Sequence, residues 1–409
     1  MAHLGPRDGL RVLAGTGSVL DAHEAVLSSL HNPGPLCPRD ELRLPAGRAL
    51  GARQRPNVAG MRYRTLGGTG IQVSAYCLGA MMLGEWGNKD HEDGVRIVHA
   101  ALDAGINFVD TADVYSHGES EEIVGKALQG RRDDVVLATK VNFDMGPGKN
   151  NSGNSRRWIR YEVEQSLRRL GTDWIDLYQI HRPDPRTDIE ETLSVLTDLI
   201  REGKVRAIGC STFPAEMIVE SRWAAEKRGF EPFRCEQPPY SLFARGIEAA
   251  VLPVCERYGM GVIAWSPLAG GWLTGKYRRG AEIDMTSGRA SRLPQRFDPT
   301  VPANQRKLDL VDQLEAVATD AGMSLRHLAL AFVVSHPAVT AAIIGPRTMD
   351  QLQDLIAGCE IALDDATLDR LDEIVPPGVT VNPADAGWQN QSLAQAWQRR
   401  RPLTERAAG

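Results

Sequence analysis

Residues 106–112, 135–141 and 174–181 read INFVDTA, VVLATKV and WIDLYQIH, and these three segments decide the fold. Each is a short, nearly continuous apolar run that ends in polar residues, as expected of a strand that is buried on both faces. Five further segments of this kind are YCLGA (76–80), VRAIGCST (205–212), FRCEQ (233–237), GVIAWSPL (261–268) and AAIIGP (341–346). The sequence therefore predicts eight strands of the type found in parallel sheets.

Segments with helical periodicity separate these strands. Residues 91–105, 156–171, 188–203 and 214–229 carry apolar side chains at spacings of three and four, with Gly at their ends, as helix C-termini often have. The strict alternation of strand and helix favours an α/β fold, a closed (β/α)8 TIM barrel with its helices outside. A doubly wound parallel sheet is the structural alternative.

The ends of the chain depart from this alternation. Residues 1–60 are rich in Gly, Pro and Arg, with one short candidate helix near residues 20–30, so we interpret them as a disordered or misassigned extension, or else as a regulatory arm. Residues 61–79 contain two short apolar runs around a Gly-rich turn and predict an N-terminal β-hairpin. Residues 364–375 predict an extra C-terminal helix.

The expected domains follow from these boundaries: an extension over 1–60, a barrel over 61–375 and a C-terminal tail over 376–409. The polar, Pro-containing stretch from Arg278 to Arg306 follows the seventh strand. It predicts a long loop over the mouth of the barrel.

Composition and charge limit the class of function. The 409 residues include 47 basic and 52 acidic side chains, a net charge of −5 without long runs of either sign, so we expect no nucleic-acid or membrane partner. The hydrophobic fraction of 42% allows a sizeable core. Six Cys without a CxxC pair, and apolar runs shorter than the roughly 20 residues that span a bilayer, favour a soluble, cytoplasmic protein. None of these features specifies an oligomeric state.

Polar side chains end three successive strands of the predicted barrel. These are Asp110, Lys140 and His181, and Tyr115 lies on the loop that follows the first of them. In a barrel the carboxyl ends of the strands meet at one face, where active sites lie. The alternation of side chains puts Asp110 on the same face as Phe108, so the polar groups converge if that face is the lumen.

A convergent cluster of this kind suits the reduction of a carbonyl group by hydride. The developing alkoxide needs a proton donor, and a phenol with a pKa near 10 is weak unless its anion is stabilised. The Lys140 ammonium at roughly 4 Å would attract the phenolate by about 4 kcal/mol at an effective dielectric of about 20, so we expect the pKa of Tyr115 to lie below its ordinary value. Asp110 would hold Lys140 charged, and His181 would hydrogen-bond the carbonyl.

Taken singly, each residue also has a structural explanation. Asp110 could cap a helix, Lys140 could be an ion-pair partner at the rim, and His181 could be a satisfied core histidine. The presence of all the groups at strand ends, in the order the chemistry needs, favours the functional interpretation.

Three segments carry a resemblance to a known family: GINFVDTADVYSHGESEEIVGKAL (105–128), LATKV (137–141) and YQIHRPD (178–184). They resemble the signature segments of the aldo-keto reductases, most of all the branch of bacterial members and potassium-channel β-subunits, from Met61 to about Val375. The resemblance implies NADPH-dependent reduction of aldehydes or ketones to alcohols. It also implies that Tyr115 is the general acid, that Lys140 and Asp110 tune it, and that His181 orients the carbonyl of a small-molecule substrate.

The sequence has no GxGxxG opening a first βα unit, so a dinucleotide would bind outside the Rossmann arrangement. Gly270 to Lys276 match the first seven positions of a P-loop, but the next residue is Tyr277 rather than Ser or Thr, which disfavours a nucleotide triphosphatase. A Gly-rich backbone followed by Lys276 suits a pyrophosphate.

The resemblance also implies a set of NADPH-binding residues. The carboxamide would bind Ser211 and Gln237, and the nicotinamide ring would stack on Trp265. The diphosphate would be lined by Ser266, Leu268, Gly270 and Lys276. The 2′-phosphate would be surrounded by Gly345, Arg347 and Gln351, and the adenine would lie near Asp354. Arg347 favours NADPH over NADH, because a guanidinium recognises a phosphate dianion, although a solvated loop charge is the alternative. Thr212 and Leu355 stand where the family commonly has Asn.

Two other functions compete with carbonyl reduction. A metal-dependent hydrolase would need clustered ligands such as HxH on an early strand, and the sequence has none, so we expect no metal site. An NADPH-binding regulatory subunit with little turnover is the second hypothesis, and the complete set of four catalytic residues argues against it. The sequence does not identify the substrate.

Overall fold

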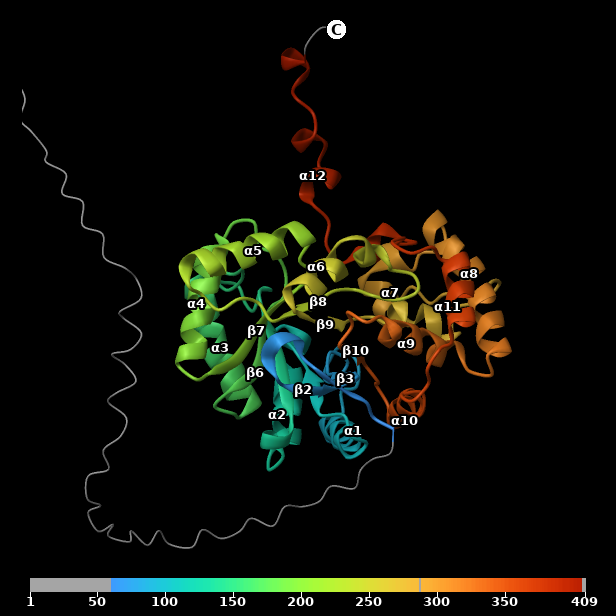
Figure 1. Cartoon of the computed structure of the whole chain (residues 1–409), viewed down its shortest axis with the longest axis horizontal. Coiled ribbons are helices and arrows are strands. Elements are labelled where there is room, and N and C mark those ends of the chain that lie inside the picture. Colours follow the sequence, from blue (N-terminus) through green and yellow to red (C-terminus); the bar gives the residue numbers. More distant parts are fainter. Residues whose placement is uncertain (1–59, 287, 407–409) are drawn as a thin grey trace, which may run out of the picture. The chain divides into compact units, whose positions relative to one another are not determined.

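The computed structural model describes residues 60–286 and 288–406. The expected extension up to residue 59, with the candidate helix near residues 20–30, lies outside these residues. Eight parallel strands close into a barrel in the order β10-β3-β4-β5-β6-β7-β8-β9. Helices surround the ring of strands (Figure 1). This confirms the (β/α)8 barrel and excludes the doubly wound sheet.

Each barrel strand lies within one of the eight apolar segments. The strands are β3 (Tyr76–Gly79), β4 (Phe108–Asp110), β5 (Val136–Val141), β6 (Ile175–Ile180), β7 (Val205–Ser211), β8 (Cys235–Gln237), β9 (Gly261–Ala264) and β10 (Ala341–Ile344). Their register aligns Asp110 with Ala138 and Lys140 with Gln179. The polar ends of β4, β5 and β6 therefore meet on one side of the barrel.

Several of the helices begin or end at capping residues. The helices are α1 (His91–Asp103), α2 (Glu119–Leu128), α3 (Arg156–Leu170), α4 (Ile189–Arg201), α5 (Ala215–Arg228), α6 (Val251–Tyr258), α7 (Gly288–Arg292), α8 (Pro302–Asp320), α9 (Leu325–Ser335), α10 (Met349–Ala357), α11 (Asp365–Ile374) and α12 (Gln391–Ala394). The side chains of Ser155 and Asp188 accept backbone N–H groups at the starts of α3 and α4. Gly171 and Gly229 take left-handed conformations at the ends of α3 and α5.

The predicted hairpin closes the amino-terminal end of the barrel. Strands β1 (Tyr63–Thr65) and β2 (Gln72–Ser74) pair antiparallel. Leu66 and Val73 from this hairpin are fully buried against a layer of inward-facing side chains that includes Phe108 and Leu177. The barrel is thus solid at this end, and only the opposite end is free to form a site.

The barrel interior changes from apolar to polar along the strands. Phe108 is followed two residues later by Asp110, Ala138 by Lys140, and Leu177 by Gln179. Because side chains alternate along a strand, the apolar layer packs against the hairpin and the polar layer lies toward the carboxyl ends.

Two predicted segments need correction. The stretch from Arg278 to Arg306 is not all loop, since it contains α7 and the first turn of α8, which Pro302 opens with its fixed φ. The tail after residue 375 is not wholly irregular, since it contains the short helix α12, and it is partly packed: the Val381 N–H donates to the Phe243 carbonyl at 2.9 Å. The extra helix is α11.

No single helix among the described residues has both the length and the apolar character needed to cross a bilayer. Helices α8 and α9, bent by 88° at their junction, meet that test only as a pair.

Candidate active site

A buried ion pair joins the ends of β4 and β5. Lys140 Nζ donates to Asp110 Oδ2 at 2.6 Å and to the Thr111 carbonyl at 2.8 Å. The other oxygen of Asp110 accepts from Gln237 Nε2 at 2.8 Å and from Gln179 Nε2 at 3.3 Å. Both carboxylate oxygens are therefore satisfied, and a pair held in this way keeps its geometry.

Tyr115 lies over this ion pair on the loop after β4. Its hydroxyl is 3.3 Å from Lys140 Nζ. The next two residues, Ser116 and His117, have φ angles of 48° and 56°, a left-handed conformation that L residues rarely adopt. The Ser116 hydroxyl accepts a hydrogen bond from the backbone N–H of Trp86 at 3.1 Å. This bond fixes the turn that aims Tyr115 into the barrel.

Burial and neighbouring charges set the protonation states of Tyr115 and Lys140. Burial raises the pKa of Tyr115 above its ordinary value, although Lys140 acts in the opposite direction. Burial on its own would lower the pKa of Lys140, but Asp110 and then Tyr115 raise it overall. The expectation of a net acidified phenol is therefore wrong, because burial outweighs the ammonium. At neutral pH Tyr115 holds its proton beside a charged Lys140.

His181 follows β6 and faces the Tyr115 ring, with centroids 5.6 Å apart and planes at 79°. The Phe143 ring also packs against His181, with centroids 4.7 Å apart. Burial, then the charges of Lys140 and Arg182, lower its pKa well below the ordinary value, so the imidazole is neutral. Within the described residues its buried Nδ1 has no hydrogen-bond partner. A neutral imidazole can donate to a carbonyl oxygen from one nitrogen.

The next strand ends carry three of the expected cofactor residues. Ser211 ends β7 and donates to the Gln237 carbonyl at 2.8 Å, while Gln237 ends β8. Trp265 follows β9, with the guanidinium carbons of Arg182 and Arg296 5.8 Å and 5.9 Å from its ring. Thr212 has a φ of 60°, a further left-handed residue at this rim.

The segment after Trp265 has an unusual backbone. Ser266 and Ala269 have φ angles of 55° and 50°, and Gly270 and Gly271 have φ angles of 73° and 109°. Leu268 precedes this turn and is partly buried, whereas Lys276 lies exposed after it. Between Lys276 and α7, the described residues form no helix, unlike the P-loop arrangement. Successive left-handed and right-handed residues of this kind form concave backbone sites that bind anions.

The expected adenosine residues follow β10. Gly345 comes directly after the strand, and the Arg347 N–H donates to Gln351 Oε1 at 2.9 Å. Asp354 is paired with Arg326 at 3.2 Å. The Asn88 amide donates to the Arg347 carbonyl at 3.1 Å, which ties this segment to the loop after β3.

Sequence reasoning missed a cluster of arginines on the loop after β9. Arg289 Nη1 lies 3.9 Å from the position that a Cβ on Gly270 would occupy. Burial, then Arg296 and Arg292, lower the pKa of Arg289 to about 10. In the described part of the chain, only Arg296 of these three has an ion-pair partner, Asp385 at 2.5 Å. The spacing of three and four in GRASRLPQR (288–296) was the available signal.

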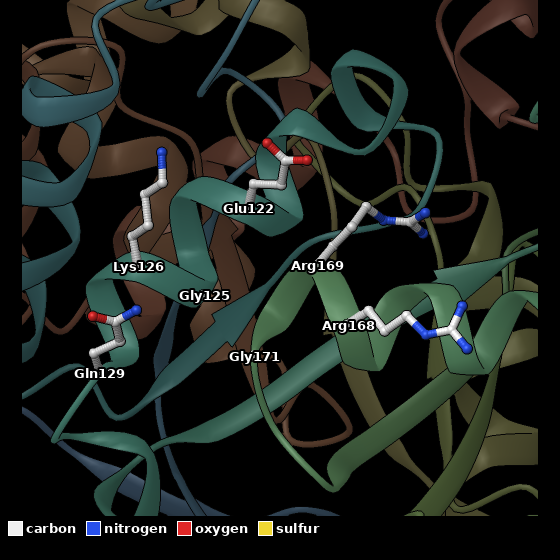
Figure 2. Close-up of a pocket in the computed structure, with 7 residues that line it drawn as sticks. All are labelled: Glu122, Gly125, Lys126, Gln129, Arg168, Arg169 and Gly171. Atoms are coloured by element: carbon white, nitrogen blue, oxygen red, sulfur yellow. The ribbon is translucent and has the colours of Figure 1, made fainter.

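A hollow on the outer surface, between α2 and α3, is separate from these residues (Figure 2). It is lined by Glu122, Gly125, Lys126, Gln129, Arg168, Arg169 and Gly171. A Cβ at Gly125 would come within 2.7 Å of the Arg169 carbonyl, so this glycine allows the two helices to pack closely. Arg169 turns inward to Glu121 at 2.7 Å and Glu162 at 2.5 Å. These contacts give the hollow a structural role.

The fold and the strand-end residues define a barrel oxidoreductase, and comparison with known proteins agrees. Residues 75–376 match the model of the aldo/keto reductase family. The chain belongs to this family, and it is accordingly an oxidoreductase that acts on carbonyl groups with a nicotinamide dinucleotide.

Several relatives are similar over most of the chain. The uncharacterized oxidoreductase YrpG of Bacillus subtilis (strain 168) is 40% identical over 339 residues, which cover 80% of this chain and 100% of the relative. The aldo-keto reductase YhdN of the same organism is 39% identical over 300 residues, 72% of this chain and 88% of that protein. A probable voltage-gated potassium channel subunit beta of Arabidopsis thaliana is 35% identical over 329 residues, 77% and 97% of the two chains. These relatives confirm the branch that the sequence indicated.

Proposed function

We propose that this protein reduces aldehydes or ketones to alcohols with NADPH and that Tyr115 is the proton donor. The observation that carries the proposal is the position of Lys140 Nζ, which contacts both Asp110 Oδ2 and the Tyr115 hydroxyl. A substrate carbonyl between Tyr115 and His181 would receive hydrogen bonds from two neutral donors.

The residues at the mouth fit a phosphate-bearing dinucleotide. Gly270 presents a concave backbone beside Arg289, and a Cβ there would press on the Phe297 ring at 3.1 Å. Arg289 and Arg347 have no ion-pair partner among the residues described here, so their charge is available to an anion. The nicotinamide end would be held by Ser211, Gln237 and Trp265. The diphosphate would be held by Ser266, Leu268, Gly270 and Lys276, and the adenosine end by Gly345, Arg347, Gln351 and Asp354.

The chemistry divides between the cofactor and the chain. When bound, the dinucleotide supplies a hydride to the carbonyl carbon. Tyr115 gives its proton to the carbonyl oxygen as negative charge develops there. Lys140 then faces the phenolate over 3.3 Å and stabilises it, and Asp110 keeps Lys140 charged. His181 limits the carbonyl to one orientation.

The test is NADPH oxidation at 340 nm with a panel of aldehydes. Tyr115→Phe keeps the ring and removes the donor, so kcat should fall at least about 100-fold. Tyr161→Phe is the matched control, because Tyr161 is exposed on α3, and it should leave kcat unchanged. Unchanged turnover in Tyr115→Phe would refute the assignment.

The relatives named as potassium channel β-subunits favour one alternative, an NADPH-binding regulatory subunit with little turnover. Tight NADPH binding by the wild-type protein, measured by nucleotide fluorescence, without turnover of any aldehyde in the panel would favour it. Small-molecule substrates and a cytoplasmic setting remain part of the first proposal.

A further inference from the structure

A hollow of about 330 Å³ opens beside Trp86, whose ring lies 6.1 Å from that of Tyr115. It is lined by Glu85, Trp86, Lys89, His117, Ser291 and Arg292. These residues come from the loop after β3, the loop after β4 and helix α7. The hollow is therefore built by three segments that are distant in sequence.

Aromatic contacts connect this hollow to the reactive residues. The Trp86 ring lies 6.1 Å from the Tyr115 ring and 6.1 Å from the His117 ring. The guanidinium carbon of Arg292 also lies 5.3 Å from the centroid of the Trp86 ring. A molecule whose carbonyl reached Tyr115 would extend along Trp86 toward Arg292.

The far end of the hollow carries excess positive charge. Neither Lys89 nor Arg292 has a carboxylate within ion-pair distance among the described residues. Glu85 is the carboxylate that lines the same hollow. Arg289 stands close enough behind Arg292 that the charge of Arg292 contributes to lowering its pKa. An anion placed here would meet the unpaired guanidinium group of Arg292 rather than a neutralised surface.

We propose that this hollow binds the far end of the carbonyl substrate and selects substrates that carry a carboxylate, with Arg292 as the group that recognises it. Trp86 packs against the carbon skeleton and orients the guanidinium. This inference rests on the proposed carbonyl reduction, and it adds the substrate class: aldehydes or ketones with an acidic group at the end away from the reacting carbon.

The experiment compares 4-carboxybenzaldehyde with methyl 4-formylbenzoate, which have similar shape but differ in charge, in full-length protein with NADPH. The wild-type protein should show a kcat/KM about tenfold higher for the acid at low salt, and the preference should shrink as ionic strength rises. Arg292→Gln should abolish the preference through the KM of the acid, with little change for the ester. Arg292→Lys should keep part of it.

Two further variants sharpen the test. Arg168→Gln removes one positive charge at the outer hollow of Figure 2 and should leave the preference intact. Glu85→Gln removes the opposing carboxylate and should increase the preference. The KM for NADPH should be unchanged in Arg292→Gln, because Arg292 faces the substrate in this proposal.

The outcomes separate the two proposals. Turnover of both aldehydes with equal kcat/KM, or a preference that Arg292→Gln leaves intact, would overturn the substrate class while carbonyl reduction stands. A rise in the KM for NADPH alone would assign Arg292 to the cofactor and also overturn it. No turnover of either aldehyde would overturn the proposed function itself.

Discussion

Gln237 Nε2 donates to Asp110 Oδ1 at 2.8 Å, and this bond crosses the barrel from β8 to β4. In the circular strand order these two strands lie opposite one another, with three strands between them on each side. The bond leaves Asp110 with one oxygen for Gln237 and the other for Lys140. This hydrogen bond therefore links opposite sides of the polar layer through Asp110.

Asp110→Asn tests whether Asp110 keeps Lys140 charged. The amide cannot neutralise Lys140, so burial of Lys140 is no longer opposed by a carboxylate and its pKa should fall. We expect kcat to fall about 100-fold, and the loss of activity at high pH should begin at a lower pH than in the wild type. Profiles of kcat against pH check this. An unchanged high-pH limb would show that Asp110 does not hold the charge of Lys140.

Glu236→Gln should make stability less dependent on pH. Burial raises the pKa of Glu236 to about 7, whereas in the unfolded chain it ionises near 4.5. The folded state therefore favours the protonated acid. The contribution of Glu236 to the free energy of unfolding is complete below about pH 4 and is lost as pH rises to about 7. At pH 8 the variant should gain stability on the order of 3 kcal/mol, because a neutral amide avoids burying a charge.

The measurement is urea unfolding between pH 4 and pH 8 for the wild type and for Glu236→Gln. Glu220→Gln, at an exposed position on α5, serves as the matched control and should leave the pH dependence unchanged. Parallel curves for the wild type and Glu236→Gln would contradict the prediction.

Arg347→Leu should weaken the binding of NADPH but not that of NADH. The guanidinium has no carboxylate partner among the residues described, and a 2′-phosphate offers it a bidentate acceptor. We expect the KM for NADPH to rise about tenfold, which corresponds to about 1.4 kcal/mol, with little change for NADH. Steady-state kinetics with both cofactors check this, and Arg168→Leu is the control. An equal rise for both cofactors would place Arg347 away from the 2′-phosphate.

Leu66→Ala should destabilise the protein without changing the reaction. The side chain is fully buried where the hairpin meets the barrel interior, so its loss leaves a cavity. The free energy of unfolding should fall by about 2–5 kcal/mol, while kcat of the folded protein stays constant. Leu403→Ala, at a position that is 79% exposed, should have no effect on unfolding. A large loss of kcat at constant stability would mean that the hairpin acts on the site.

The sequence predicted the eight strands and the order of the polar residues at their ends, because buried parallel strands combine continuous apolar runs with strict alternation. Phe108 and Asp110 illustrate this, since one signals the core and the other the rim. The bond between Gln237 and Asp110 could not be predicted, as it depends on the closure of the barrel.

The loop after β9 was harder to predict for a different reason. Arg289 and Arg292 lie in a short helix within a polar stretch, where no apolar periodicity marks which side chains turn inward. Their positions depend on packing against Gly270 and Trp86, which are distant in sequence. Burial of Tyr115 was equally hidden, so the direction of its pKa shift was misjudged.

The plug that Leu66 and Val73 form at the amino-terminal end has a kinetic consequence under the proposed function. Both reactants must therefore enter and leave through the carboxyl end of the barrel. The reactant that binds nearer to this opening prevents the other from entering or leaving. We propose that the dinucleotide is the deeper of the two, so it should bind before the aldehyde and leave after the alcohol, and the oxidised dinucleotide should compete with NADPH but not with the carbonyl compound.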